Sequence, residues 1–463
     1  MTRFTRAAVC AALAFGATGL AGCDFTDGND VNPNGATTAT ADLLLNAAEV
    51  GQIQVQEGNF ARTAGIFAGY FTGSDRQYAA LEEGRQNSDD YSNDWGTAYA
   101  AALDDANLAV QAYDEGNNRI GSGVAKIHRE LTFGTLADLF GDIPYSQALN
   151  SEEFEDPQFD AQADVYNGVI GTLNAAIADI NSGVGVIGTD ADLFFGTTNG
   201  SEYVPVANTL IARYHLALGN YGEAAAAARN GISDPSGDLV APHGSSAGNL
   251  NQYWEFGVFD RGGYLTANGA SAVQLLVDRD SASTDGRTDE SGRLSYFYNA
   301  PSVAGADLNF GGSGAFGISQ SFPIVTYVEN QLILAEALLL TGDEDGALEA
   351  LNEVREYNED RYGDGDDNLE YETFESDDFA DGNALLREIL TEKYLSTIGQ
   401  IVGFTDLRRT DNFIGIQGKD NGRVPQRFIY ARVELNSNEN APSPIPGPLD
   451  ELPVFASYSY NGV

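Results

Sequence analysis

Residues 136–149 read Leu-Ala-Asp-Leu-Phe-Gly-Asp-Ile-Pro-Tyr-Ser-Gln-Ala-Leu, and this stretch decides the fold. Its first residues are the end of an apolar-striped segment, residues 122–140, which predicts a helix. Gly141 permits the backbone conformation of a helix cap, and Pro144 cannot continue a helix, so the chain must turn here. The stretch therefore indicates a helical scaffold whose helices are separated by sharp turns.

Apolar residues at helical spacing recur on both sides of this turn. The other segments that predict single helices are residues 41–56, 94–115, 162–181 and 382–395. Two further segments predict helical hairpins, residues 203–231 with a break at 218–224 and residues 323–357 with a break at 340–343. Each break has a glycine at a helix end and an alanine-rich second helix, a pattern similar to tetratricopeptide repeats, although no clean 34-residue period runs through the chain.

The remaining segments differ in composition. Residues 183–202 and 232–322 are rich in Gly, Ser, Asn and Asp, with aromatic residues between them, and predict long loops or a loop-dominated insertion. The predicted fold class is mainly α: a tetratricopeptide-like helical-hairpin scaffold with long loop-rich insertions. We expect residues 41–463 to form a single domain.

The charge of the chain is strongly negative. It has 24 Lys+Arg against 68 Asp+Glu, a formal net charge of −44, and only three of the basic residues are lysines. This balance excludes a general nucleic-acid binder, which needs a basic surface. Two cysteines and three histidines give no disulfide framework and leave little for zinc chemistry. An acid excess with so little lysine indicates a halophilic source, with an ordinary acidic surface as the alternative.

The first 22 residues predict a lipoprotein signal peptide. Arg3 and Arg6 precede a short apolar run, and Leu-Ala-Gly stands directly before Cys23. Small residues before a cysteine are typical of the lipobox, in which that cysteine is lipidated and becomes the first residue. Residues 23–40 then predict an acidic tether, so we expect a chain anchored to a membrane by lipid alone. The alternative is a soluble secreted protein in which Cys23 is incidental.

Five blocks of the chain, in order, resemble the SusD/RagB-like outer-membrane lipoproteins of glycan uptake. These blocks are residues 136–149, 157–166, 392–394, 404–410 and 424–430, and they are completed by Glu434 and Asn438. Ala431 departs from the family pattern, which has proline after the tyrosine. The resemblance implies a non-catalytic surface protein that lies over a TonB-dependent, SusC-like barrel in the outer membrane and delivers oligosaccharides to it.

The residues of these blocks have a structural interpretation as well. Asp406, Arg408 and Arg409 are predicted to form bidentate pairs that tie the C-terminal region to the helical scaffold. Signature residues of this kind identify the family without marking its binding site.

A glycan site needs flat aromatic faces for the sugar rings and planar polar groups for their hydroxyls. One loop that leads into a helix offers both, and the resemblance implies further contacts in the second insertion. The candidate ligand-binding residues are Tyr70, Phe71, Tyr78, Arg85, Asp89, Tyr91, Trp95, Tyr253, Trp254, Arg261, Tyr264, Arg293, Tyr296 and Tyr298. Taken singly, most of these aromatic residues are as compatible with core packing as with ligand contact.

One acidic stretch has the spacing of a calcium loop. Oxygen-bearing side chains stand at the ligand positions, among them Asp364, Asp366, Asn368 and Glu375. Leu369 occupies the position where the loop requires glycine, so a solvated acidic loop is the preferred interpretation. We expect no cofactor and no catalytic residue.

Two other functions remain open. A lipoprotein glycoside hydrolase would need two suitably spaced carboxylates, which composition alone cannot exclude. A relative that binds peptides in place of glycans, or a scaffold that binds only proteins, would have the same helical body. No nucleophile elbow, zinc motif or histidine-centred arrangement occurs in the sequence.

Overall fold

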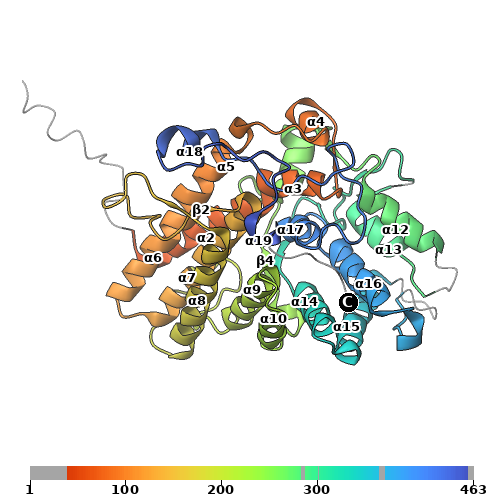
Figure 1. Ribbon diagram of the computed structural model, residues 1–463. Helices are drawn as coiled ribbons and strands as arrows, with labels where there is room; N and C mark the ends of the chain where they lie inside the picture. Colours follow the sequence, from red (N-terminus) through yellow and green to blue (C-terminus); the bar gives the residue numbers. More distant parts are fainter. Residues whose placement is uncertain (1–38, 283–286, 301, 364–370, 457–463) are drawn as a thin grey trace, which may run out of the picture. The chain divides into compact units, whose positions relative to one another are not determined.

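The computed structural model describes residues 39–282, 287–300, 302–363 and 371–456 (Figure 1). Ala41–Val463 form one compact unit, and it is described here by itself. The predicted signal peptide, the tether with Cys23, and the calcium candidates Asp364, Asp366 and Asn368 lie outside the described residues.

The body of the unit is a series of packed helical hairpins. α6 packs on α7, α7 on α8, α8 on α9, α9 on α10, α10 on α14 and α14 on α15, and they follow one another across the lower part of Figure 1. Their bounds, with the N-terminal helices, are α2 Ala41–Glu57, α3 Asn59–Phe67, α4 Arg76–Glu82, α5 Ser92–Thr97, the π-helix η2 Ala98–Leu103, α6 Asp104–Glu115, α7 Arg119–Phe140, α8 Gln162–Asn181, α9 Tyr203–Ala217, α10 Tyr221–Ala228, α14 Tyr327–Leu340 and α15 Glu344–Tyr362. The predicted mainly helical, tetratricopeptide-like fold is confirmed.

The two predicted hairpin turns are found at their glycines. Gly219 and Gly342 have φ of 74° and 89°, a left-handed conformation that other residues adopt only with strain. After the second turn, Asp343 caps α15 by accepting the N–H of Gly346 at 3.1 Å. Local sequence chemistry therefore determines where these helices end and begin.

The second insertion contains more regular structure than its composition predicts. α12, Ser271–Ala282, buries Ala272, Val273 and Leu276 at helical spacing, although the Gly/Ser-rich flanks hide this pattern in the sequence.

The remaining helices are η1 Ser88–Tyr91, η3 Pro235–Gly237, α11 Gln252–Trp254, the π-helix η4 Glu255–Asp260, α13 Ser291–Phe297, η5 Ser376–Asp378, α16 Gly382–Ser396, α17 Ile401–Arg409, α18 Arg432–Ser437 and α19 Pro453–Ala456.

Within the described residues there are four two-stranded antiparallel sheets. The pairs are β1 Thr72–Gly73 with β5 Leu265–Thr266, β2 Ile143–Pro144 with β3 Phe159–Asp160, β4 Leu239–Ala241 with β8 Phe322–Val325, and β6 Tyr298–Asn299 with β7 Asp307–Leu308. Two of them, β1 with β5 and β4 with β8, connect segments that are distant in sequence. β1 and β5 attach the second insertion to the segment between α3 and α4. β4 and β8 enclose the insertion between them, and α14 starts directly after β8.

The C-terminal segment returns to the first half of the chain. Phe428 donates its N–H to the carbonyl of Leu139 at 2.8 Å, and the Tyr430 hydroxyl donates to the carbonyl of Asp142 at 2.7 Å. The ring of Phe428 packs edge-on against Phe140, with centroids 5.8 Å apart. The turn at residues 136–149 and the block at 424–430 are therefore two sides of one packed interface.

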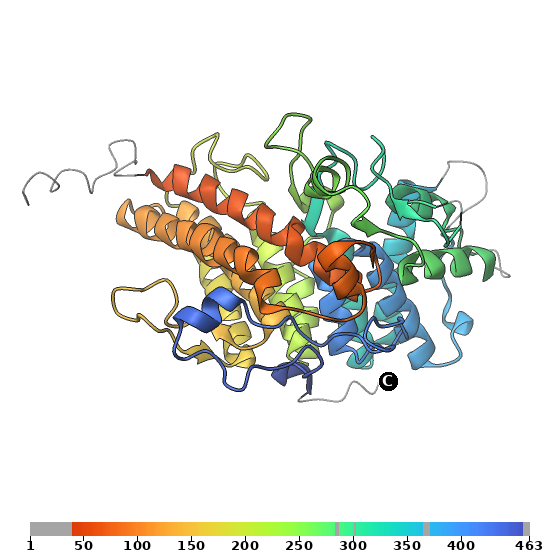
Figure 2. The same cartoon turned by 90° about the horizontal axis from the view of Figure 1, so that it is seen from above.

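Figure 2 shows α2 running beside α6, against which it packs. Within the described ranges, every helix is too short or too polar to cross a membrane.

Candidate functional site

Eight of the fourteen candidate ligand residues lie in the interior. They are Tyr70, Phe71, Tyr78, Tyr91, Trp95, Tyr253, Arg293 and Tyr298, each with at most 3% of its surface exposed. Several of their hydroxyls have backbone partners inside the fold: Tyr253 donates to the carbonyl of Gly399 at 2.7 Å, and Tyr298 to that of Tyr70 at 3.0 Å. A ring with no exposed face cannot stack on a sugar, so these eight residues leave the ligand-binding set as a correction to the sequence analysis.

The loop after α4 and the short helix η1 each contribute one exposed candidate with an existing partner. Arg85 forms an ion pair with Glu83 at 2.5 Å, and Asp89 lies 3.6 Å from the guanidinium of Arg432. Pairs this exposed contribute little to stability, so a ligand could replace them at small cost. Arg85 and Asp89 supply charge, but they offer no flat surface on which a sugar ring could lie.

An exposed aromatic surface is found instead on the segment from Trp254 to Tyr264. We call Trp254, Phe259, Arg261 and Tyr264 the aromatic platform. Phe259 is 76% exposed, and Val258 beside it is 48% exposed. Arg261 is exposed as well, while Trp254 and Tyr264 are half-buried.

The π-helix η4 follows directly on α11, so Phe259 stands five residues after Trp254 in one continuous helical segment. Hydrogen bonds of a π-helix join residues five apart, as the N–H of Arg261 does with the carbonyl of Phe256 at 2.7 Å. In an ordinary α-helix, residues five apart point in clearly different directions. The wider helix therefore reduces the angle between the directions of Trp254 and Phe259.

The start of this helix is fixed by buried polar groups. Asn251 accepts the N–H of Trp254 at 3.1 Å, and the Glu57 carboxylate at the end of α2 accepts the N–H of Gln252 at 2.8 Å. The other Glu57 oxygen lies 2.6 Å from Nε2 of His243. Burial raises the pKa of Glu57, and its hydrogen bond with His243 opposes that shift. The platform is therefore attached directly to the helical scaffold.

The inner side of the platform rests on an aromatic base. The Phe256 ring lies 5.1 Å from Tyr78 and 6.5 Å from Tyr264, measured between centroids. The guanidinium of Arg62 lies over the Phe256 ring at 4.3 Å, and its Nε donates to the Tyr78 hydroxyl at 3.1 Å. Phe256 therefore holds the π-helix in place, and Phe259 is left facing solvent.

A polar groove with a volume of about 490 Å³ lies next to the end of α4. Its polar lining comes from α4, α12 and the loop after α17, and includes Glu82, Gln274, Asp278, Gln417 and Lys419. Lys419 and Glu82 form an ion pair of 2.6 Å across it. Amide and carboxylate groups of this kind suit sugar hydroxyls, so the groove can extend the surface that a long chain would contact.

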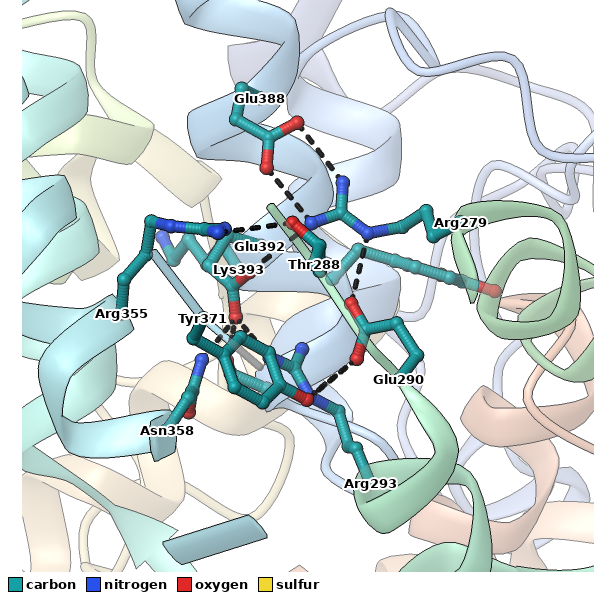
Figure 3. Close-up of polar contacts among 12 residues, drawn as sticks. Arg279, Thr288, Glu290, Arg293, Arg355, Asn358, Tyr371, Glu388, Glu392 and Lys393 are labelled. Atoms are coloured by element: carbon teal, nitrogen blue, oxygen red, sulfur yellow. Dashed lines mark hydrogen bonds and ion pairs between the residues drawn. The ribbon is translucent and has the colours of Figure 1, made fainter. Parts of the chain in front are cut away.

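Arg293 belongs to a buried charge cluster (Figure 3). It donates to Glu392 at 2.7 Å and lies 3.2 Å from Glu290, while Arg279 binds Glu388 through two nitrogens at 2.9 and 3.0 Å. Burial alone would raise the pKa of Glu392, but Arg293 and the neighbouring arginines outweigh it and hold that pKa below its usual range. The charged form of Glu392 is therefore favoured, and the cluster joins α12 and α13 to α16.

Glu375, the one described calcium candidate, has a local role. Its N–H donates to Asp378 at 2.7 Å as part of the cap of η5. Within the described ranges, no three His, Cys, Asp or Glu side chains are grouped so that they could hold a metal ion. Calcium binding by the stretch at 364–375 stays a prediction, because most of it lies outside those ranges.

Phe259 is the residue that the sequence analysis missed. It stands in Phe-Gly-Val-Phe-Asp-Arg, residues 256–261, where glycine and aspartate indicate a loop and two phenylalanines look equivalent. The fold distinguishes them: the Phe256 ring packs on Tyr78, whereas Phe259 is exposed. Between them, Gly257 lies against the ring of Phe310, where an added Cβ would come within 2.3 Å.

The fold defines a class: a helical-hairpin scaffold with a long insertion that presents an aromatic surface. Residues 33–238 match the SusD-like family model described as "Starch-binding associating with outer membrane". Together with the solved structures below, this match confirms the resemblance to SusD/RagB-like proteins.

Solved structures extend the same fold over most of the chain. A SusD/RagB family protein from Bacteroides thetaiotaomicron has 19% identity and a TM-score of 0.66, covering 87% of this chain and 95% of that one. A SusD homolog from Bacteroides fragilis has 18% identity and a TM-score of 0.65 over 87% and 94%. A chitin-binding SusD homolog from Flavobacterium johnsoniae has 14% identity and a TM-score of 0.62 over 85% and 93%. No curated protein sequence matches the chain.

Proposed function

We propose that this protein is a cell-surface, outer-membrane lipoprotein that binds oligosaccharides or polysaccharides without cleaving them. It delivers them to a TonB-dependent, SusC-like transporter. The observation that carries the proposal is Phe259, which is 76% exposed one π-helical turn from Trp254. A large aromatic ring held in water on a rigid helix marks a binding surface.

The platform has the chemistry that a sugar requires. The C–H face of a pyranose packs on a flat aromatic ring and avoids the desolvation cost of its hydroxyls. Arg261 extends from the same segment, and its NH1 donates to the carbonyl of Asp260 at 3.1 Å, which leaves further N–H groups for hydroxyl oxygens. The polar groove beyond α4 would contact sugars farther along the same chain.

The family description and the chitin-binding homolog favour a glycan as the ligand. The lipobox before Cys23 supports anchoring by lipid. Replacing Cys23 with Ser should move the protein from the outer-membrane fraction to the soluble fraction. Recovery of the substituted protein in the membrane fraction would contradict lipid anchoring through this residue.

The test of the binding surface is a set of affinities for soluble polysaccharides, measured in high salt with the wild type, Phe259→Ala and Trp254→Ala. Each substitution should weaken binding at least tenfold and leave the thermal unfolding midpoint nearly unchanged. Val433→Ala is the matched control, because Val433 on α18 is similarly exposed at 47% and lies outside the platform. Equal affinity of Phe259→Ala and the control would exclude the platform as the site.

The same incubations distinguish the alternative functions. Released sugar would indicate a glycoside hydrolase, and binding of peptides in place of every glycan would indicate a peptide-uptake relative. Co-purification of a barrel protein from the source membrane tests the transporter partnership, which fails if the protein elutes alone from gently solubilised membranes.

A further inference from the structure

A second pocket, which opens to solvent, lies between α13, the loop before β8, α15 and α16. Its cavity volume is about 60 Å³. Its walls carry the aromatic side chains of Tyr296, Phe297, Phe316, Phe322, Tyr357 and Tyr362. We call it the tyrosine pocket. None of the four platform residues lines it, so it is a separate site.

The rear of the tyrosine pocket is held by the charge cluster of Figure 3. Asn358, a lining residue, donates to Glu392 at 2.8 Å, and the guanidinium of Arg293 lies 5.4 Å from the ring centroid of Tyr362. Because Asn358 is hydrogen-bonded to the buried Glu392, the cluster holds this wall of the pocket. A ligand that contacts a wall already held in place loses little binding energy to reorganisation.

Arg361 gives the pocket its charge. Its NH1 donates to the Tyr357 hydroxyl at 2.7 Å and its NH2 to the Tyr296 hydroxyl at 3.1 Å. Its guanidinium carbon lies 5.2 to 5.8 Å from the centroids of three tyrosine rings. In the part of the chain that the structure describes, no carboxylate lies within 4.0 Å of it. Asp238 in the same pocket interacts with Arg361 through space without forming an ion pair, so the Arg361 guanidinium keeps further N–H groups for a ligand.

Two further lining groups can contact a ligand. Gln400 is buried between this pocket and a smaller internal cavity, and its Oε1 has no hydrogen-bond partner. Asp238 accepts the N–H of Tyr327 through Oδ1 at 2.6 Å, which leaves its second oxygen for another donor. The pocket therefore combines aromatic walls, a cation that is bonded to two tyrosine hydroxyls, and oxygen acceptors.

We propose that the tyrosine pocket binds one uronic-acid unit of an acidic oligosaccharide. The planar carboxylate of the sugar would accept two N–H bonds from the Arg361 fork, as carboxylates do from arginine. The C–H face of the ring would pack on the tyrosines, and a sugar hydroxyl would donate to Gln400. The inference rests on the proposed function, since it names a glycan, but it concerns a different site from the platform.

The test is a calorimetric titration in 1 M NaCl, which screens the repulsion between the acidic protein and an acidic ligand. Oligogalacturonates and oligoglucuronates of four units are compared with a neutral glucan of equal length and with the methyl esters of the acidic oligomers. The wild type should bind an acidic oligomer at least tenfold more tightly than its methyl ester.

Substitutions test whether Arg361 is responsible for the preference for the acidic oligomer over its methyl ester. Arg361→Gln should lose it, whereas Arg229→Gln, which removes one exposed charge from the end of α10, should keep it. Arg361→Lys keeps the charge without the planar fork and should retain only part of the preference, which also covers the case that Arg361→Gln unfolds. Phe259→Ala should keep the preference for the acidic oligomer.

Equal affinity of the wild type for the acid and its ester, or an unchanged preference in the Arg361 variants, would overturn the proposal. If the uronic-acid proposal fails in this way and neutral glycans still bind through Phe259, the proposed function remains supported. Absence of binding to every glycan would overturn both. Tight binding of a peptide that ends in a carboxylate, without any binding of uronates, would overturn the assignment to a sugar.

Discussion

Arg409 of α17 forms a bidentate pair with Glu336 of α14: its two terminal nitrogens donate to the two carboxylate oxygens at 2.6 and 2.5 Å. Its Nε donates to Asp406 at 2.7 Å. This pair joins the C-terminal region to the helical scaffold, as the sequence predicts for Arg409. Arg408 behaves differently from the prediction, because its NH1 donates to the carbonyls of Asp138 and Gln426 at 2.8 and 3.1 Å.

Removing one partner of this pair should be strongly destabilising. Glu336→Ala removes the bidentate partner of the buried Arg409, and the loss of this ion pair should lower the free energy of unfolding by about 3 kcal/mol. Urea unfolding at pH 7 measures this change. Glu83→Ala removes the partner of Arg85 at the surface and should change stability by less than about 0.5 kcal/mol. Equal effects of the two substitutions would contradict the role assigned to the buried pair.

Stability should depend on pH through Asp238. Burial raises the pKa of this carboxyl from its ordinary 3.8 to about 7, while the Tyr327 N–H and Arg361 oppose the shift and Glu329 and Asp234 add to it. Between these two pKa values the folded state keeps a proton that the unfolded state has lost, so stability falls as pH rises from about 4 to about 7.

The substitution Asp238→Asn should remove that dependence. The amide keeps an oxygen to accept the Tyr327 N–H and carries no charge to desolvate. At pH 8 the variant should be more stable than the wild type by about 2 to 4 kcal/mol, and at pH 4 the two should agree. Chemical unfolding across this range checks the result, and parallel pH profiles would show that another group is responsible.

The π-helix should require its glycine. In Gly257→Ala the new methyl group would meet the Phe310 ring, so η4 must shift, and we expect a loss of about 2 kcal/mol together with weaker glycan binding. Gly222 in α10 has open space around it, so Gly222→Ala should be neutral or stabilising by about 0.5 kcal/mol. Thermal unfolding and glycan affinity of both variants provide the measurement. An unchanged glycan affinity in Gly257→Ala would show that binding at the platform does not depend on the geometry of η4.

The acidic surface should make folding dependent on salt. Many of the basic residues, among them Arg213, Arg293 and Arg409, are used in buried ion pairs, which leaves much of the acid excess exposed. At about 1 M salt the Debye length is about 3 Å, so the repulsion between surface carboxylates is screened. The unfolding midpoint should fall when NaCl is reduced from 2 M to 20 mM, and a constant midpoint would contradict the halophilic interpretation.

Local patterns predicted the helical body well. The apolar stripe of α7 and the glycines that end α9 and α14 depend on neighbours within a few residues, so they can be recognised without the fold. The ligand surface could not be recognised in the same way. Tyr91 and Trp95 stand in a polar loop sequence, yet Tyr91 stacks on Phe428 at 4.7 Å and Trp95 donates to Glu434 at 3.2 Å.

These two contacts bridge more than 330 residues, and nothing near Tyr91 or Trp95 in the sequence indicates them. Phe259 shows the opposite case. It is exposed, whereas Gly257 two residues before it lies against the ring of Phe310, about fifty residues away. An aromatic residue in a glycine-rich stretch can therefore become core or surface, and only the tertiary fold decides which.

The contact between Tyr430 and Asp142 joins positions 288 residues apart. Because this contact needs residues from both ends of the chain, the interface between residues 136–149 and 424–430 can form only after residue 430 has been synthesised. Closing so long a loop costs conformational entropy, so we expect this interface to form late in folding.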